Sequence, residues 1–333
     1  MKRILLIVIT MIMSFMASYA IDNTKGNIDK VVAVVNNEPI FISEVNTIVN
    51  SLISRSPTTL VKQNELKNII LNQQIEALLL KQEAKKQKIQ VTKQEIQLGI
   101  NEIKKLFKNE QDFNNELKKL NMTITNLTRN VTEQISIIKL LSKSLSSKIK
   151  IPNETEIKSF YDKFFINFKP VNKENNTDII TFVNLLRKKF SEHVKIQQIF
   201  IKCPKNASAT QIQAAQTKIA NIKGALQKQK SFTSIASHYS SNFGLIYKND
   251  LANNINNVIF NLKVGEYTKE PIKTDNGYHF IKIEEKYARR DLNYNDVKND
   301  IKEFLYRKSF MREYISYIKS LKSKSYIKIN QNW

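Results

Sequence analysis

The residues best suited to chemistry lie between Asn261 and Ile283, where the chain reads NLKVGEYTKEPIKTDNGYHFIKI. The sequence has only six glycines, and Gly265 and Gly277 both fall in this segment. Glycines that bound β-prone runs mark turns with backbone angles that other residues avoid, so we expect a helix end followed by two strands. His279, one of three histidines, begins the second strand. Because an imidazole can titrate near neutral pH, His279 is the first candidate for a functional side chain.

The other residues of chemical interest do not extend this site. Neither His193 nor His238 has the spacing of a metal site or of a catalytic triad. Cys203 is the only cysteine, so it has no partner for an intramolecular disulfide and is most simply a small apolar residue. The sequence contains no Walker-type phosphate-binding loop, so any action on other proteins would not use ATP. We therefore predict no metal ion and no cofactor.

The net charge of +23 does not indicate a nucleic-acid partner. Most of the 53 basic residues are Lys, spread along the whole chain, whereas base readout and phosphate binding favour Arg. A positive surface still attracts acidic proteins and anionic lipids, so we expect transient contact with a membrane surface.

The first twenty residues predict export. Lys2 and Arg3 precede an apolar run over 4–17, and small residues at Ser18 and Ala20 suit signal peptidase, so we expect a signal peptide cleaved near Ala20. The run is shorter than the roughly twenty residues of a membrane span. An uncleaved inner-membrane anchor is the alternative.

The N-terminal half should be mostly helical after one strand pair. Residues 31–42 read VVAVVNNEPIFI and predict two strands around Asn36 and Asn37. Helices are then expected from Ser43 as N-cap to Pro57, over 60–88, from a Thr92–Glu95 capping box toward 107, over 110–120, from Thr123, and over 152–165.

The second half predicts a compact α+β domain and a long last helix. Within about 90 residues the sequence predicts, in this order, a strand over 194–203, helices over 209–229, 232–239 and 251–260, and the two terminal strands. The helix over 293–323 has one apolar side, and an edge strand over 326–329 follows it. Because such a helix depends on tertiary contacts, we expect it to return to the N-terminal helices.

The segment with His279 closely resembles the end of a parvulin-type peptidyl-prolyl isomerase domain. Residues 29–38 and 42–45 resemble the start of the SurA family, which are periplasmic chaperones for outer-membrane proteins, and residues 325–330 match its C-terminal end. In that family the N-terminal helices and the last helix form the chaperone core, with parvulin domains between them. The best-known members carry two such domains, and this chain has room for one.

The resemblance implies an α+β fold, in which a multi-helix N-terminal chaperone domain is completed by the C-terminal helix and one parvulin-like α+β domain is inserted between them. The implied boundaries are a signal peptide over 1–20, a helical chaperone domain over 21–166, a linker over 167–192, a parvulin-like domain over 193–287, and a C-terminal helix and strand over 288–333.

The resemblance also implies site residues. Rotation about an X-Pro bond faces a barrier of about 18–20 kcal/mol, and a catalyst needs a ring pocket and polar groups that favour the twisted amide. Parvulins use two histidines, a Cys or Asp, an apolar pocket and a Thr. The catalytic positions would be His279, Thr274, Gln198 in place of the first histidine and Asn242 in place of the Cys or Asp. The substrate-binding positions would be Leu251, Ile255, Phe243 and Phe200, and 243–246 resembles the turn before the pocket helix.

These replacements indicate a weak isomerase, because Gln and Asn form hydrogen bonds but cannot carry charge or share a proton as His and Cys or Asp can. His279 itself has an alternative interpretation as a strand histidine bonded within the sheet. Four aromatic residues over 160–165 could contact clients or simply pack a domain junction: Phe160, Tyr161, Phe164 and Phe165.

Three classes of function therefore stay open. The first is an ATP-independent periplasmic chaperone that assists the folding and delivery of unfolded outer-membrane and other exported proteins. The second is a working peptidyl-prolyl isomerase, anchored or free. The third is an interaction protein that borrows the fold.

Overall fold

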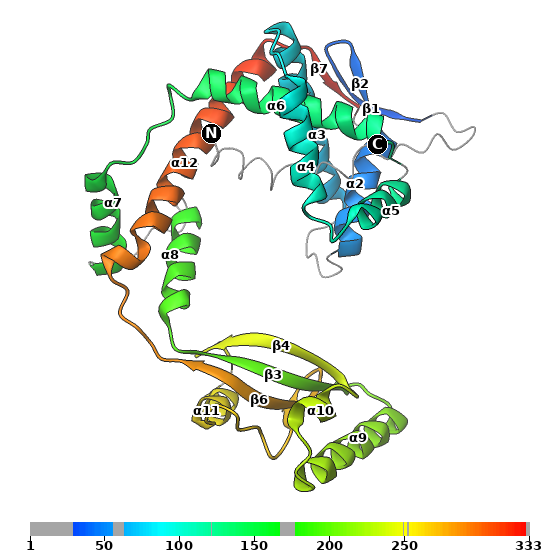
Figure 1. The fold of residues 1–333 in the computed structure, drawn as a ribbon, viewed down its shortest axis with the longest axis vertical. Helices are drawn as coiled ribbons and strands as arrows, with labels where there is room; N and C mark the ends of the chain where they lie inside the picture. Colours follow the sequence, from blue (N-terminus) through cyan, green and yellow to red (C-terminus); the bar gives the residue numbers. More distant parts are fainter. Residues whose placement is uncertain are drawn as a thin grey trace. The chain divides into compact units, whose positions relative to one another are not determined.

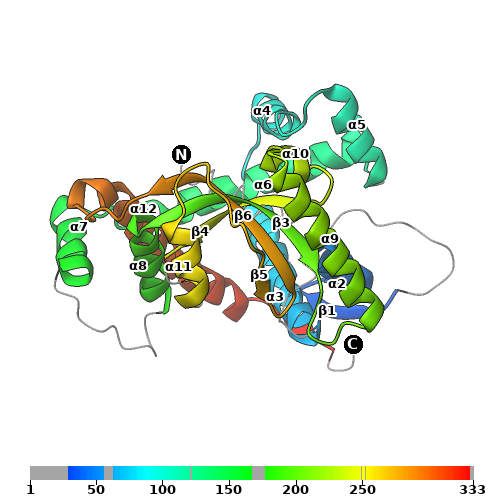
Figure 2. The same ribbon diagram turned by 90° about the horizontal axis from the view of Figure 1, so that it is seen from below.

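The computed structural model describes residues 29–55, 63–120, 122–166, 177–248, 250–251 and 253–330 (Figures 1 and 2). The predicted leader and the residues around Pro57 lie outside this range. The chain divides into two compact units: the first runs to Pro152 and resumes at Leu305, and the second covers 153–304. Among the described residues, no helix is both long and apolar enough to span a membrane.

A three-stranded antiparallel sheet joins the two ends of the first unit. β1 (Val31–Val35) pairs with β2 (Glu38–Phe41) on one side and with β7 (Ile327–Ile329) on the other. Asn36 makes the turn between β1 and β2 with a φ of 55°, and its Oδ1 accepts a 3.0 Å bond from the backbone N–H of Tyr326. The predicted strand pair and edge strand are confirmed.

In the described residues of the first unit, five helices follow the strand pair: α2 (Ile42–Arg55), α3 (Gln63–Lys86), α4 (Lys93–Lys104), α5 (Glu110–Lys119) and α6 (Ile124–Leu145). The capping box at Thr92 is present, since its hydroxyl accepts from the Glu95 backbone and the Glu95 carboxylate accepts from the Thr92 backbone. Thr123 caps α6 as predicted. Ser43 is not an N-cap, because α2 already begins at Ile42 and the Ser43 hydroxyl bonds the Asp29 carboxylate instead.

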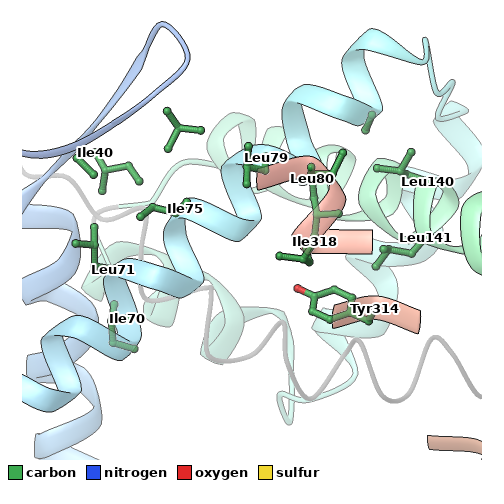
Figure 3. Close-up of a cluster of buried hydrophobic side chains, with 14 of the residues drawn as sticks. Ile40, Ile70, Leu71, Ile75, Leu79, Leu80, Leu140, Leu141, Tyr314 and Ile318 are labelled. Atoms are coloured by element: carbon green, nitrogen blue, oxygen red, sulfur yellow. The ribbon is translucent and has the colours of Figure 1, made fainter. Parts of the chain in front are cut away.

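The last helix, α12 (Tyr294–Ser323), supplies part of the core of the first unit. Figure 3 shows Tyr314 and Ile318 of α12 among side chains of α3 and α6, such as Leu80 and Leu140. Phe310 and Leu321 of the same helix are buried in this cluster as well. The predicted return of the last helix to the N-terminal helices is confirmed.

A small helical group opens the second unit. α7 (Glu154–Tyr161), the π-helical turn η2 (Asp162–Ile166) and α8 (Thr177–Phe190) pack with the first part of α12. The Phe160 ring lies 5.7 Å from that of Phe304, and Phe182 stacks on Phe304 at 4.1 Å. Phe160, Tyr161 and Phe164 are buried, so of the two interpretations of the aromatic group, packing holds for these three and client contact does not. Phe165 is half-buried and stacks on Tyr161.

Helix α8 lies inside the range 167–192 that the sequence predicted to be a linker. Its buried residues, Ile179, Val183, Leu186 and Phe190, repeat at helical spacing and give it an apolar side to pack. The polar composition at the start of the range concealed this pattern, and residues 167–176 lie outside the described part.

The rest of the second unit is a four-stranded antiparallel sheet with helices on both faces. The strand order is β4-β3-β6-β5. In chain order the elements are β3 (His193–Lys202), α9 (Ala209–Gln227), α10 (Phe232–Ala236), β4 (Ser240–Tyr247), α11 (Asn253–Asn261), β5 (Ile272–Thr274) and β6 (Gly277–Tyr287). Helices α9 and α10 pack on one face through Ile199 and Phe280, and α11 packs on the other through Ile196 and Ile281.

Two details of this sheet bear on the sequence predictions. Gly277 has a φ of 151°, and a Cβ there would lie 2.0 Å from the Ile201 carbonyl oxygen, so only glycine fits the turn between β5 and β6. The predicted order of three helices before the last strands is wrong, because β4 intervenes between α10 and α11. β4 is an exposed edge strand and lacks the buried apolar alternation that marks a strand in sequence.

We predict that Ile318→Ala lowers the free energy of unfolding of the first unit by about 2–5 kcal/mol, because it removes a buried side chain from the core that α12 completes. The matched control is Ile315→Ala on the same helix, which is 60% exposed and should change the free energy by no more than about 0.5 kcal/mol. Urea titration followed by the NMR amide signals of α3 measures both. Equal effects of the two substitutions would contradict the packing.

Candidate functional site

The candidate site lies on the face of the isomerase-like sheet that α11 covers. Side chains alternate along a strand, so Gln198 and Phe200 of β3 share this face with the buried Ile196. His279 of β6 pairs directly with Phe200, and their rings lie 4.9 Å apart. Thr274 ends β5, beside the turn at Gly277. The fold therefore brings four of the predicted residues together.

Hydrogen bonds engage both ring nitrogens of His279. Nε2 lies 3.0 Å from the Thr274 hydroxyl, and Nδ1 lies 3.3 Å from the side-chain oxygen position of Gln198. The Gln198 Oε1 atom can only accept, so Nδ1–H donates to it, and Nε2 of the neutral ring accepts from the Thr274 hydroxyl. The Gly277 carbonyl oxygen, 3.2 Å from the same hydroxyl, is its alternative acceptor. A neutral histidine ring therefore satisfies the hydrogen bonds of both ring nitrogens.

Burial lowers the pKa of His279 from its ordinary value of 6.5. A carboxylate hydrogen-bonded to this ring would favour its charged form, and among the described residues there is none. The imidazole is therefore neutral at pH 7 and is held as one link of a hydrogen-bonded chain from Gln198 to Thr274.

Three of the remaining predicted residues lie at the border of the site. Asn242 of β4 pairs with Gln198, lies on the same face and is exposed. Ile255 of α11 is half-buried against the core of that face, and exposed Leu251 accepts a 2.7 Å bond at its carbonyl from the Asn256 side chain. These positions border the site.

Phe243 does not join them. It pairs with Gln197, whose side chain lies on the α9 and α10 face, so strand alternation directs Phe243 away from His279. Its side chain is 63% exposed there. The segment 243–246, predicted to resemble a turn, is instead part of strand β4.

Sequence reasoning missed two residues beside the site. Ile272 of β5 pairs with His279 and is half-buried, so it adds an apolar wall on the far side of the ring. Asn256 is buried on α11 and positions the Leu251 backbone, while its own Oδ1 has no partner. Ile272 could have been identified from the sequence, because pairing the two strands across the turn before Gly277 places it opposite His279. Nothing in the sequence distinguishes Asn256 from the other asparagines of α11.

Two protein families match this chain, one in each unit. Residues 1–141 match the SurA-like N-terminal domain, and residues 199–285 match the PPIC-type peptidyl-prolyl isomerase domain. The second range covers nearly the whole sheet that carries the candidate site. The two matches lie in the order that the resemblance implied.

Individual relatives are more distant. The foldase protein PrsA of Geobacillus kaustophilus is 23% identical over 232 residues, which is 67% of this chain and 65% of its own length. The chaperone SurA of Buchnera aphidicola is 27% identical over 205 residues, 59% of this chain and 45% of its own. Both matches therefore span less than two thirds of the relative. A solved SurA-like chaperone of Campylobacter jejuni aligns over 91% of this chain and 100% of its own at 17% identity, with a TM-score of 0.40.

The fold and the family matches define a protein that combines two domain types. One is a parvulin-type isomerase domain with an antiparallel sheet. The chain joins it to a SurA-like N-terminal helical domain and a C-terminal helix, so the resemblance inferred from the sequence is confirmed.

We predict that the isomerase-like domain loses stability as the pH falls below about 6.5. The unfolded imidazole of His279 takes up a proton there that the folded one resists. Proton uptake therefore lowers the free energy of the unfolded state relative to the folded state as the pH drops from the ordinary pKa toward the lowered one. His279→Gln should remove this part of the pH dependence, and His238→Gln, at an exposed position, should leave it in place. Urea titrations at pH 7.5 and 5.5 measure it, and an unchanged slope in His279→Gln would refute the assignment.

We predict that the pair Gln198→His and Asn242→Asp raises kcat/KM for a proline peptide by at least about tenfold in a protease-coupled assay, because it restores groups that can exchange protons. Ser241→Asp is the control, since it adds a carboxylate on the opposite face of β4. A wild-type chain that is already a fast isomerase, with activity lost in His279→Ala, would contradict the premise.

Proposed function

We propose that this protein is a periplasmic chaperone that holds unfolded exported proteins, with outer-membrane proteins among its clients, and that acts without ATP. The observation that carries the proposal is the composite first unit, in which the SurA-like N-terminal helices and the last helix share one core. The relatives named SurA and PrsA support the class. We further propose that a leader cleaved near Ala20 directs the chain to the periplasm.

Client binding in this proposal rests on many weak contacts. Large apolar side chains stay exposed on several helices of the first unit, among them Ile53 on α2, Ile69 on α3, Leu98 on α4, and Met311 and Ile315 on α12. Weak apolar contacts of this kind suit an extended polypeptide that is bound without one fixed sequence and released by thermal exchange. The aromatic group over 160–165 no longer contributes, because it is mostly buried.

The isomerase domain is proposed to be a weak catalyst. A catalyst must offer polar groups whose interactions strengthen as the amide twists. Here both ring nitrogens of His279 already bond neighbours in the sheet, and these bonds would have to break for the ring to reach a substrate. His279, Thr274, Gln198 and Asn242 remain the proposed catalytic positions, with Leu251, Ile255 and Phe200 as the proposed contacts of the substrate.

We keep 193–287 as the proposed range of the isomerase domain. The family match over 199–285 supports it, as does the pairing of His193 with Tyr287, the first and last residues of the range. Paired residues on neighbouring antiparallel strands lie about 5 Å apart, so the whole range can be excised and the ends rejoined by a short Gly-Ser link.

We predict that the mature chain suppresses aggregation of a urea-unfolded β-barrel protein, and that a version without 193–287 keeps at least about half of this activity, since the proposed contacts lie in the first unit. Light scattering after dilution of the denaturant measures it. His279→Ala in the full chain controls for isomerase activity and should change nothing. Complete loss of suppression in a folded deletion variant would show that the isomerase domain holds the clients.

A further inference from the structure

The outer edge of strand β4 takes no part in the candidate site. β4 lies at one edge of the four-stranded sheet and, among the described residues, pairs with β3 alone (Figure 1). Its eight residues, Ser240–Tyr247, pair with β3 without a register shift, so the strand is regular along its length. A regular edge strand presents unpaired backbone groups and is a template on which a further strand can form.

The alternation of hydrogen bonds along β4 determines which backbone groups are unpaired. The Lys248 N–H donates to the Glu192 carbonyl at 2.8 Å, so these two residues form a hydrogen-bonded pair. Hydrogen-bonded and non-hydrogen-bonded pairs alternate in an antiparallel ladder. The even-numbered residues from 240 to 246 therefore bond β3, and the N–H and C=O groups of Ser241, Phe243 and Leu245 point outward. In the described part of the chain these outward groups have no hydrogen-bond partner.

The side chains of β4 make this edge apolar on one face and polar on the other. Phe243 is 63% exposed and Leu245 is 54% exposed, and both lie on the face of the sheet that carries α9 and α10. The opposite face carries exposed Ser240 and Asn242 next to the small Gly244. A strand that fits against both faces must therefore alternate between apolar and polar residues.

The other sheet edges of the described residues have features that prevent further pairing. β2 contains Glu38 and Pro39, β5 has three residues that include Lys273, and β7 has three residues that include Lys328. Charge, proline and short length are the usual means by which an edge strand avoids an added strand. β4 has eight residues, and none of them is charged or proline. The sequence thus protects these three edges and leaves the edge of β4 open.

The charges next to β4 are balanced, although the whole chain has a net charge of +23. Three lysines beside the strand each form an ion pair with a carboxylate: Lys195 with Glu285, Lys248 with Glu192, and Lys188 with Asp250. An uncharged edge with paired neighbours is complementary to an uncharged segment. A second copy of this chain is disfavoured as the occupant, because two chains that each carry +23 repel one another.

We propose that the outer edge of β4 binds an extended, uncharged segment of a client polypeptide as an added antiparallel strand. The apolar side chains of this segment lie beside Phe243 and Leu245, and its polar side chains lie beside Asn242. The strand pairs β3–β4, β3–β6 and β5–β6 of the sheet are antiparallel, and antiparallel pairing is slightly more stable than parallel pairing, which favours this direction.

This inference rests on the proposed chaperone function for the source of the segment, whereas the binding edge is defined by β4 itself. Segments that alternate between apolar and polar residues build membrane-spanning β-barrels, which are among the proposed clients. Main-chain hydrogen bonds to the edge would supply affinity without a fixed client sequence. The edge adds a contact in the second unit to the contacts proposed for the first unit, so deletion of 193–287 removes part of the client binding.

The test titrates short peptides into the full mature chain and follows the β4 amide signals by NMR. The probe is a capped hexapeptide of alternating threonine and valine. In the proposed pairing its valines lie opposite Ser241, Phe243 and Leu245, so the valine N–H groups point toward β4 and the threonine N–H groups point away. N-methylation of the three valines should therefore weaken binding by at least about tenfold more than N-methylation of the three threonines. Equal affinity of the two methylated peptides, or tighter binding of the one methylated at valine, overturns the proposal.

A substitution on the edge provides a second measurement. Phe243→Lys should weaken the unmethylated peptide by about fivefold or more, because it replaces an apolar contact by a charge on the edge. The melting temperature should change little, since the Phe243 side chain is mostly exposed. Val258→Lys is the matched control, because it makes the same change of charge at an exposed position of α11, and it should bind the peptide like the wild type. Wild-type affinity in a folded Phe243→Lys variant would refute the site.

The remaining outcomes separate this proposal from its alternatives. A concentration-dependent dimer in sedimentation velocity that Phe243→Lys abolishes would assign the edge to a second copy and overturn the proposal. If the chain fails to suppress aggregation but binds the peptides as expected, the strand-binding edge stands and the chaperone proposal falls. If aggregation is suppressed but the hexapeptide does not bind, the chaperone proposal stands and the strand-binding edge falls.

Discussion

Burial of the second half of α12 among the N-terminal helices is the interaction on which the architecture depends. Phe310, Tyr314, Ile318 and Leu321 enter the same apolar cluster as the side chains of α3 and α6 (Figure 3). Burial also raises the pKa of the Tyr314 hydroxyl well above its usual range, which keeps that group neutral. The pairing of β7 with β1 adds a backbone connection between the two ends of the chain. The hydrophobic effect therefore requires two segments about 150 residues apart to fold as one unit.

This constraint explains how an isomerase-like domain can be present without being essential to the first unit. The chain leaves the first unit after Pro152 and returns at Leu305, and everything between forms a second unit with its own cores. The SurA-like part can then keep its fold whatever happens at His279. In the second unit, the polar groups that a catalyst would direct at a substrate are instead bonded to one another. These hydrogen bonds stabilise the sheet and leave few free hydrogen-bonding groups that could stabilise a twisted amide.

Much of this could be predicted from the sequence, because the signals were local or strongly periodic. The Thr92 capping box depends on two residues three apart, and Gly277 marks a turn that no other residue fits. The return of α12 followed from its apolar side. The failures concern information that the sequence does not carry locally. β4 is an exposed edge strand without buried alternation, and Phe243 was assigned to the wrong face because the strand register was unknown.

Native-state hydrogen exchange of the intact chain tests the central claim most directly. If the second half of α12 completes the N-terminal core, the amides of 305–323 should exchange with the same free energy of opening as those of α3, and both should respond equally to denaturant. Two results would contradict the account while α3 stays protected. The amides of 305–323 could exchange together with the sheet of 193–287, or they could exchange at the rate of an unfolded segment.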